Sequence, residues 1–332
     1  MITFYALSAL ATLAAPQAEA VSLGRVFTKG EKMAYSVSSG LSAERRTYPL
    51  KSAFPEDFDL RYNFTMEVQS LKADGIAQIR YQRPTMTFID GETFDAPPKT
   101  KVEKSNYDLQ ILLSPVNEII DIKDIAKKPA PKKPGAKNKS LIASGAPTQD
   151  ELGPILGQFV SEIYRLSLFA GNLDTSLDLN PKMSFNKVKV GDTWKKTASY
   201  QPQKLKGAKK SIVQRLDYTY TYKGILESNG KKVYRIDAAL DLDTDLNEFI
   251  NDTYEVTSKD TGLKKLPLNL KARVAFDLDL KTRHTLLATA QTEGGYQVFV
   301  EDHPNEPIQE MKLKGQSTMR LVSRTLPVLK KK

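Results

Sequence analysis

Three aspartates stand at a spacing that metal sites also use. Asp241, Asp243 and Asp245 follow the D-x-D-x-D pattern that opens a calcium-binding loop. Leu246, however, occupies the position where such a loop needs glycine for its sharp turn, and Asp252 replaces the usual bidentate glutamate. Leucines alternating with the aspartates favour a sheet edge that is acidic outside and apolar inside. We therefore predict no metal here.

A second pair of carboxylates, Asp277 and Asp279, lies two residues apart. Residues at this spacing on a strand share one face, and glycosidases use paired carboxylates. We expect both to be outward and solvated, so a carboxylate-dependent hydrolase is only an alternative. Lys271 and Arg273 precede them on the same predicted strand face. There they are expected to offset the charges of Asp241 to Asp245 across strands.

Other catalytic residue types are scarce. The chain has two histidines and no cysteine. His284 lies beside Arg283 at a predicted strand end, with no nucleophile or carboxylate pattern around it. His303 precedes a proline in a predicted loop, which is typical of a solvated side chain. The sequence also lacks a phosphate-binding glycine loop and a serine nucleophile elbow. We predict a non-enzymatic protein with no catalytic residue, no metal site and no cofactor.

The chain contains a repeat of about 155 residues. Residues 60–66 match residues 216–222, and residues 26–32 match residues 188–194. The turn Asp74-Gly75 corresponds to Asn229-Gly230, which is a strong signal for a type I′ hairpin. Because pattern is preserved more than identity, the repeat indicates a duplicated structural unit rather than duplicated chemistry.

Strand signals dominate both copies. From residue 58 to residue 68 apolar and polar residues alternate strictly, as on a strand with one buried face, and residues 216–222 and 271–283 do the same. Further strands are predicted at residues 31–38, 76–89, 100–113, 285–291, 295–301 and 310–323. We predict a mainly β fold: two related curved antiparallel sheets, half-barrel or sandwich-like, with one amphipathic helix between them.

The predicted helix spans residues 148–171. Thr148 and Glu151 form a capping box, and Gly171 stands where a helix would stop. Apolar residues recur at three- and four-residue steps, so one face must be buried. Before it, residues 127–147 are rich in lysine and proline and are predicted to be a flexible linker.

The inward aromatic residues have two interpretations. They are either packed core beneath the helix or the lining of an apolar cavity, where the polar tip of tyrosine suits a lipid-like guest. On the second interpretation the ligand-lining residues are Tyr62, Phe64, Tyr218, Tyr220, Tyr222 and, from the helix, Phe159.

The N-terminus predicts export. Residues 2–15 are mainly apolar and Ala18-Glu19-Ala20 has the small-x-small pattern of a cleavage site, so residues 1–20 are interpreted as a signal peptide. We expect the mature protein to be periplasmic or extracellular and soluble, since no later window is apolar enough to cross a membrane.

The positive charge of the chain is concentrated in three segments. Residues 127–139 hold six lysines, residues 204–210 hold four and the C-terminus ends in three. Because these thirteen lysines exceed the net charge of +10, the remainder has no net positive charge. This distribution excludes a built nucleic-acid groove. It leaves attachment to an anionic cell-surface polymer through lysine-rich loops as an alternative function.

A turn with the sequence Gly191-Asp192-Thr193-Trp194 opens the second copy. With the signal peptide, the repeated module and the helix between modules, it resembles secreted bacterial β-proteins of uncharacterised function, over residues 26–323. A more distant likeness is to the lipoprotein-carrier half-barrel, which implies an apolar or lipid-like ligand on the inner sheet face. The expected organisation is a first β module (21–126), the linker, the helix and a second β module (172–332).

Overall fold

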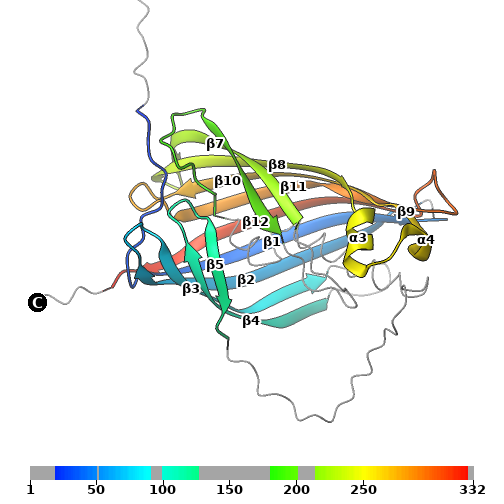
Figure 1. The fold of residues 1–332 in the computed structure, drawn as a ribbon, viewed down its shortest axis with the longest axis horizontal. Helices are drawn as coiled ribbons and strands as arrows, with labels where there is room; N and C mark the ends of the chain where they lie inside the picture. Colours follow the sequence, from blue (N-terminus) through cyan, green and yellow to red (C-terminus); the bar gives the residue numbers. More distant parts are fainter. Residues whose placement is uncertain (1–18, 51, 91–98, 127–179, 201–213, 328–332) are drawn as a thin grey trace, which may run out of the picture.

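The computed structural model describes residues 19–50, 52–90, 99–126, 180–200 and 214–327. These residues form a mainly β-structure with two short helices at one end (Figure 1). The strands of the first half are β1 (Lys32–Thr47), β2 (Phe54–Leu71), β3 (Ala77–Asp90), β4 (Lys99–Leu113) and β5 (Ile119–Asp124). Those of the second half are β6 (Thr193–Tyr200), β7 (Gln214–Ser228), β8 (Lys231–Asp245), β9 (Leu263–Lys265), β10 (Pro267–Leu278), β11 (Thr285–Val300) and β12 (Gln309–Thr325).

All strands belong to one antiparallel sheet. Its order is β5-β4-β3-β2-β1-β12-β11-β10-β8-β7-β6, and the short β9 pairs with β11. The two sheets expected from the sequence are thus halves of one sheet, because β1 pairs with β12 along its whole length. Within the described residues β5 and β6 are its free edges, so the sheet is open.

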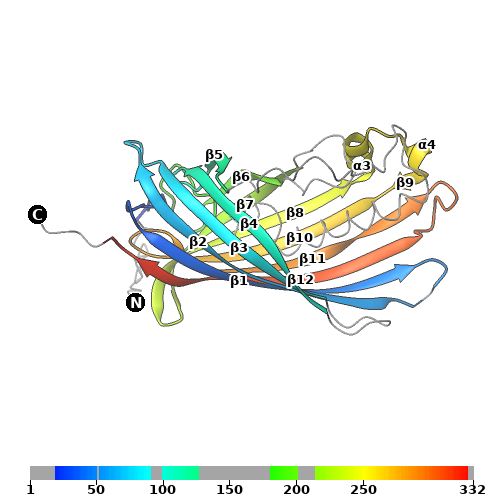
Figure 2. The ribbon, with the colours of Figure 1, turned by 90° about the horizontal axis from the view of Figure 1, so that it is seen from below.

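The sheet curls into a half-barrel. Figure 2 shows its two outer parts, β3–β5 and β6–β8, rising on the same side of the central strands β1 and β12. Apolar residues of both halves form one buried cluster, so the apolar face lies inside the curve. This inner face alternates with a polar outer face along every long strand, as on β2, where Leu60, Tyr62 and Phe64 are buried.

The duplication is visible in the backbone hydrogen bonds. Gly30 N–H donates to Val68 O, and Gly191 N–H donates to Tyr222 O, just before β1 and β6 respectively. Both glycines have positive φ, of 81° and 93°, which a glycine adopts without steric cost. The predicted hairpin at Asn229-Gly230 is confirmed, since both residues have positive φ between β7 and β8.

One strand is longer than expected. Residues 285–291 and 295–301 were predicted as separate strands, but β11 runs unbroken through Gly294 and Gly295. A Cβ on Gly294 would lie 2.1 Å from Asn269 O, and one on Gly295 would lie 2.1 Å from Met311 O. The two glycines therefore permit close approach of both neighbouring strands instead of breaking β11.

The helices that the structure describes are not the helix that the sequence predicts. Residues 148–171 and 127–147 lie outside the described residues, so the predicted helix and linker remain predictions. The observed helices, α3 (Asn247–Tyr254) and α4 (Ser258–Thr261), were not predicted. Glu255 ends α3 in the left-handed conformation usually taken by glycine, which removed the sequence signal for a helix end.

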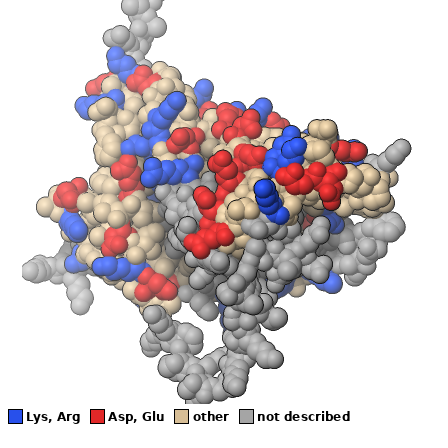
Figure 3. All heavy atoms as spheres, turned by 45° about the vertical axis from the view of Figure 1, so that its right-hand side comes forward, with Lys and Arg blue, Asp and Glu red and all other residues tan. Residues whose placement is uncertain are grey.

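Charges of both signs are mixed on the surface. On the face shown in Figure 3, lysine and arginine alternate with aspartate and glutamate over the described residues.

Candidate functional site

The five described ligand-lining candidates all lie on the inner face. Tyr62 and Phe64 belong to β2, and Tyr218, Tyr220 and Tyr222 belong to β7; each is at most 4% exposed. The sixth candidate, Phe159, lies outside the described residues. Six strand spacings separate β2 from β7 in the sheet, or about 29 Å measured along its surface. The structure therefore places the candidates in two aromatic groups rather than one.

Each aromatic group is tightly packed. Phe64 stacks on Tyr35 with ring centroids 5.0 Å apart and meets Tyr81 at 5.1 Å. On the other side, Trp194 stacks on Tyr220 at 5.7 Å. These contacts give the inner face two aromatic walls, one on β1–β3 and one on β6–β7.

Small side chains lie between the two walls, in two rows that reach β2 at Leu60 and Phe58, next to the rows of Tyr62 and Phe64. One row across the sheet pairs Ser39 with Ser317 and Ser317 with Ala290. The next row pairs Gly315 with Thr292 and Thr292 with Ala272. We call these six residues the small-residue floor: Ser39, Ser317, Ala290, Gly315, Thr292 and Ala272. All six are buried, and each extends little from the backbone.

A buried arginine adjoins the first aromatic wall and was missed in the sequence analysis. Arg83 of β3 is 1% exposed, and its guanidinium carbon lies 5.0 Å from the Tyr62 ring centroid and 4.4 Å from that of Tyr107. Such stacking stabilises a cation in apolar surroundings. The signal was available, because Ile79, Tyr81 and Arg83 share the inward phase of the alternation.

One end of the half-barrel is closed by chain segments rather than by strands. The N-terminal segment crosses it: Val21 pairs with Val188, Arg25 N–H donates to Pro115 O and Val26 N–H donates to Thr282 O. Segment 180–188 joins the β5 and β6 sides, since Met183 N–H donates to Val116 O. Leu23 and Met183 are fully buried in this plug, which we call the closed end.

Trp194 fastens segment 180–188 to β6. Its indole N–H donates to Lys182 O at 2.7 Å, which confirms the interpretation of this residue as a structural anchor. We expect Trp194→Phe to lower the free energy of unfolding by about 1–2 kcal/mol, because the ring stacking survives but the carbonyl of Lys182 loses its donor. Urea denaturation followed by circular dichroism measures this without relying on tryptophan fluorescence. An unchanged midpoint would contradict the anchor role.

The closed end contains buried charges. Glu31 is 2% exposed and accepts a hydrogen bond from Arg324 Nε. Arg25 is 4% exposed; its guanidinium donates to Met33 Sδ at 3.2 Å and lies over the Phe27 ring. Burial lowers the pKa of Arg25, whereas Glu31 nearby favours its charged form. No spacing pattern in the sequence predicts this cluster, because its members are joined only by the fold.

The surroundings of His284 correct the sequence prediction. His284 is 3% exposed, and it contacts a carboxylate through Thr282. Thr282 Oγ1–H donates to Asp279 Oδ1 at 2.8 Å, so His284 Nδ1–H donates to Thr282 Oγ1 and Nε2 carries the lone pair. Burial is the main cause that lowers the pKa of His284 to about 4, and Arg25 lowers it further.

Asp277 and Asp279 do not form the solvated pair that was expected. Asp277 is 2% exposed, because Arg235 opposite it on β8 and Ser228 at the end of β7 cover it; each donates to it at 2.6 Å. Asp279 lies beyond the end of β10, in the turn. Burial alone would raise its pKa, but hydrogen bonds from Thr282 and Lys281 leave the pKa below its usual value. The two carboxylates thus serve separate structural contacts.

The remaining candidate metal ligands lie on β8 and in a loop. Asp241, Asp243 and Asp245 are exposed, and Arg273 donates to Asp241 at 2.9 Å, which confirms the predicted charge offset across strands. His303 packs against Tyr48 with ring centroids 4.8 Å apart. Among the described residues no three histidine, cysteine, aspartate or glutamate side chains gather as a metal site would require.

Comparisons with known proteins give distant structural neighbours. No protein-family model matches the chain, and no curated protein matches its sequence. A lipovitellin structure concerned with lipid–protein interactions matches at 9% identity and a TM-score of 0.43, over 92% of this chain and 26% of that chain. This chain therefore spans about a quarter of the lipovitellin chain.

Two bacterial structures are also similar. An outer membrane lipoprotein-sorting protein domain from Vibrio parahaemolyticus matches at 10% identity and a TM-score of 0.16, over 89% of this chain and 87% of that one. A DUF1329 family protein from Desulfovibrio piger matches at 8% identity and a TM-score of 0.15, over 90% and 87%. All three TM-scores lie below 0.5, so we draw no conclusion about function from these neighbours. Within the described residues, no helix has the length and apolar character needed to span a bilayer.

Proposed function

We propose that this chain is an exported, non-enzymatic envelope protein that holds an apolar or lipid-like ligand on the inner face of its half-barrel. The observation that carries the proposal is the small-residue floor between two aromatic walls. The floor has only short side chains, and the walls provide apolar surface with tyrosine hydroxyl groups at their tips.

The shape of the half-barrel supports the same function. The closed end bounds the inner face on one side, and the floor residue Ser39 lies four residues along β1 from Tyr35, whose side chain interacts with Arg25 of the closed end. At about 3.3 Å per residue, this distance is about 13 Å. An elongated apolar ligand would lie over the small-residue floor with one end near the side chains of Tyr35 and Arg25. Export to the periplasm or the extracellular space rests on the signal-peptide pattern in residues 1–20.

Filling the floor tests the proposal. We expect Ala290→Leu to remain folded, with an overpacking cost of about 1–3 kcal/mol, and to lose its ligand because the added side chain projects from the small-residue floor on the inner face. Wild-type protein incubated with a total lipid extract should show bound lipid in native mass spectrometry, and the variant should not.

A matched control lies next to it in the chain. Thr289 is exposed on the outer face of β11, so Thr289→Leu should retain the ligand. Wild-type protein that stays empty under all loading conditions would overturn the proposal. Equal loading of both variants would overturn the floor as its site.

Attachment to an anionic polymer has no support from the described residues. Two of its lysine-rich stretches, residues 127–139 and 204–210, lie outside the described residues, so that function remains a sequence prediction. A hydrolase loses its basis in the described residues, because Asp277 and Asp279 are occupied by Arg235, Ser228 and Thr282.

A further inference from the structure

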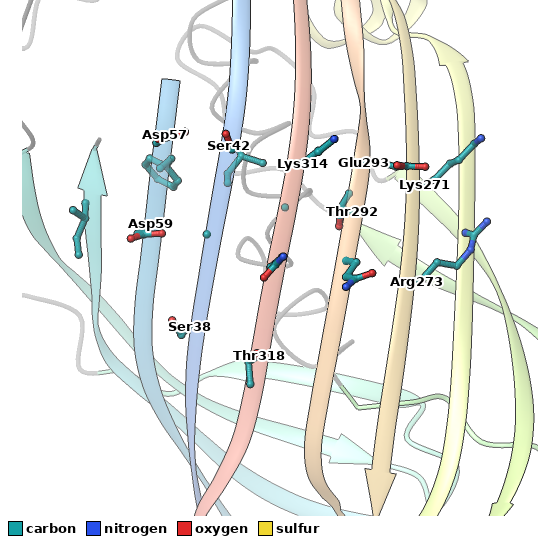
Figure 4. Close-up of a pocket in the computed structure, with 17 residues that line it drawn as sticks. Ser38, Ser42, Asp57, Asp59, Lys271, Arg273, Thr292, Glu293, Lys314 and Thr318 are labelled. Carbon is teal, nitrogen blue, oxygen red and sulfur yellow. The ribbon is translucent and has the colours of Figure 1, made fainter. Parts of the chain in front are cut away.

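The outer face of the half-barrel is hollowed along β1. A cavity of about 930 Å³ and a second of about 500 Å³ lie there, and they share Ser38 and Thr318. Both are lined mainly by polar side chains of the outward phase, as Figure 4 shows for the larger one, which Thr292 and Gly315 of the small-residue floor also border. They form one continuous trough.

Short residues on one strand create the trough. The outward residues of β1 that line the trough are Ser36, Ser38, Gly40 and Ser42, a run of about 20 Å at 3.3 Å per residue. Gly40 lies opposite Asp59 of β2, and a Cβ on Gly40 would lie 2.9 Å from Asp59 Oδ1, so this carboxylate leans over the glycine.

The lining of the larger cavity has no net charge and many hydrogen-bonding groups, whereas the smaller cavity adds Arg61 and Arg320 and no carboxylate. Serine and threonine hydroxyl groups line the larger cavity, and the amides of Gln291 and Gln316 lie opposite each other on β11 and β12. Three carboxylates and three cations surround them, with Arg273 held by Asp241. In the larger cavity these are Asp57, Asp59, Glu293, Lys271, Arg273 and Lys314.

We propose that the larger cavity of the trough binds an uncharged, hydroxyl-rich polysaccharide chain. A polyanion would meet the carboxylates of Asp57 and Asp59, and a polycation would meet Lys271 and Lys314. A neutral sugar chain can donate hydroxyl protons to the carboxylates and accept from the amides and ammonium groups. An extended peptide is less suited, because peptides add to sheet edges, and the main-chain groups at this central face are already paired within the sheet.

Filling the trough tests the site. We expect Gly40→Gln to bind neutral polysaccharide at least about tenfold more weakly than wild type, because the new side chain occupies the trough and displaces Asp59. Co-sedimentation with insoluble cellulose, chitin and β-1,3-glucan particles measures it. Ala34→Gln is the control, since Ala34 is on the same strand and face but does not line the trough.

Each alternative result overturns the proposal. These results are no co-sedimentation of wild type with any of the three particles, equal co-sedimentation of Gly40→Gln, or retention only on carboxymethyl-cellulose that salt abolishes. The trough and the inner face are on opposite sides of the sheet, so Gly40→Gln should leave lipid loading unchanged. Failure of one proposal is thereby distinguished from failure of the other.

Discussion

Replacing Glu31 by alanine is expected to lower the free energy of unfolding by about 3–5 kcal/mol. Glu31 is 2% exposed, and its carboxylate balances Arg324 and the nearby Arg25, which is itself 4% exposed. Removing one partner of a buried ion pair leaves the other charge without compensation in a poorly solvated place. Urea denaturation at pH 7 measures the loss.

An exposed ion pair beside it provides the control. Lys32 and Glu67 approach to 3.2 Å, but their side chains are 62% and 36% exposed. Solvent screening reduces the value of such a pair to about 1 kcal/mol or less, so Glu67→Ala should shift stability by no more than that. If the two variants lose equal stability, the buried cluster at the closed end does not hold the plug in place.

The same reasoning explains why the strands were predictable from sequence and the closed end was not. Alternation along β2 and β10 is a local property, since each side chain's face follows from the phase of the strand. It correctly placed Tyr62, Phe64 and the tyrosines of β7 on the inner face. The turn between β7 and β8 was also predictable, because Asn229 and Gly230 are residue types that readily adopt positive φ.

Pairing between distant segments has no such local signal. Glu31 and Arg324 are 293 residues apart in the chain, and they meet only because β1 pairs with β12. That pairing also merged the two expected sheets into one. The small-residue floor was hidden for the same reason, because Ser39, Ser317 and Ala290 become neighbours only after the sheet forms.

Hydrogen bonds between near neighbours were missed for a different reason. Asp279, Thr282 and His284 are close in sequence, but a predicted continuous strand over residues 271–283 put them in alternating directions. β10 ends at Leu278, and Arg283 takes a positive φ of 57°, so the chain turns and brings the three side chains together. A turn without glycine or proline gave no warning of this change.

His284 should make the protein lose stability as the solution becomes acidic. Its pKa in the folded protein is about 4, against an ordinary value of about 6.5, because burial disfavours the charged ring and Arg25 and Arg324 add repulsion; Asp279 only partly offsets them. The unfolded chain therefore binds the proton first as pH falls. The stabilisation is complete above pH 6.5 and is lost between pH 6.5 and 4, by about 3 kcal/mol in total.

Two variants separate the contribution of His284 to the pH dependence of stability from the contributions of other groups. His284→Gln removes the titrating ring, so its free energy of unfolding should fall by about 3 kcal/mol less than that of wild type between pH 7 and pH 4. His303→Gln removes the other histidine, which packs at the opposite end of the sheet against Tyr48, and should keep the wild-type loss. Parallel urea-denaturation curves for wild type and His284→Gln across this range would contradict the buried, neutral state of His284. A reduced loss in His284→Gln alone would show that a neutral ring, close to the charge of Arg25, stabilises the folded protein.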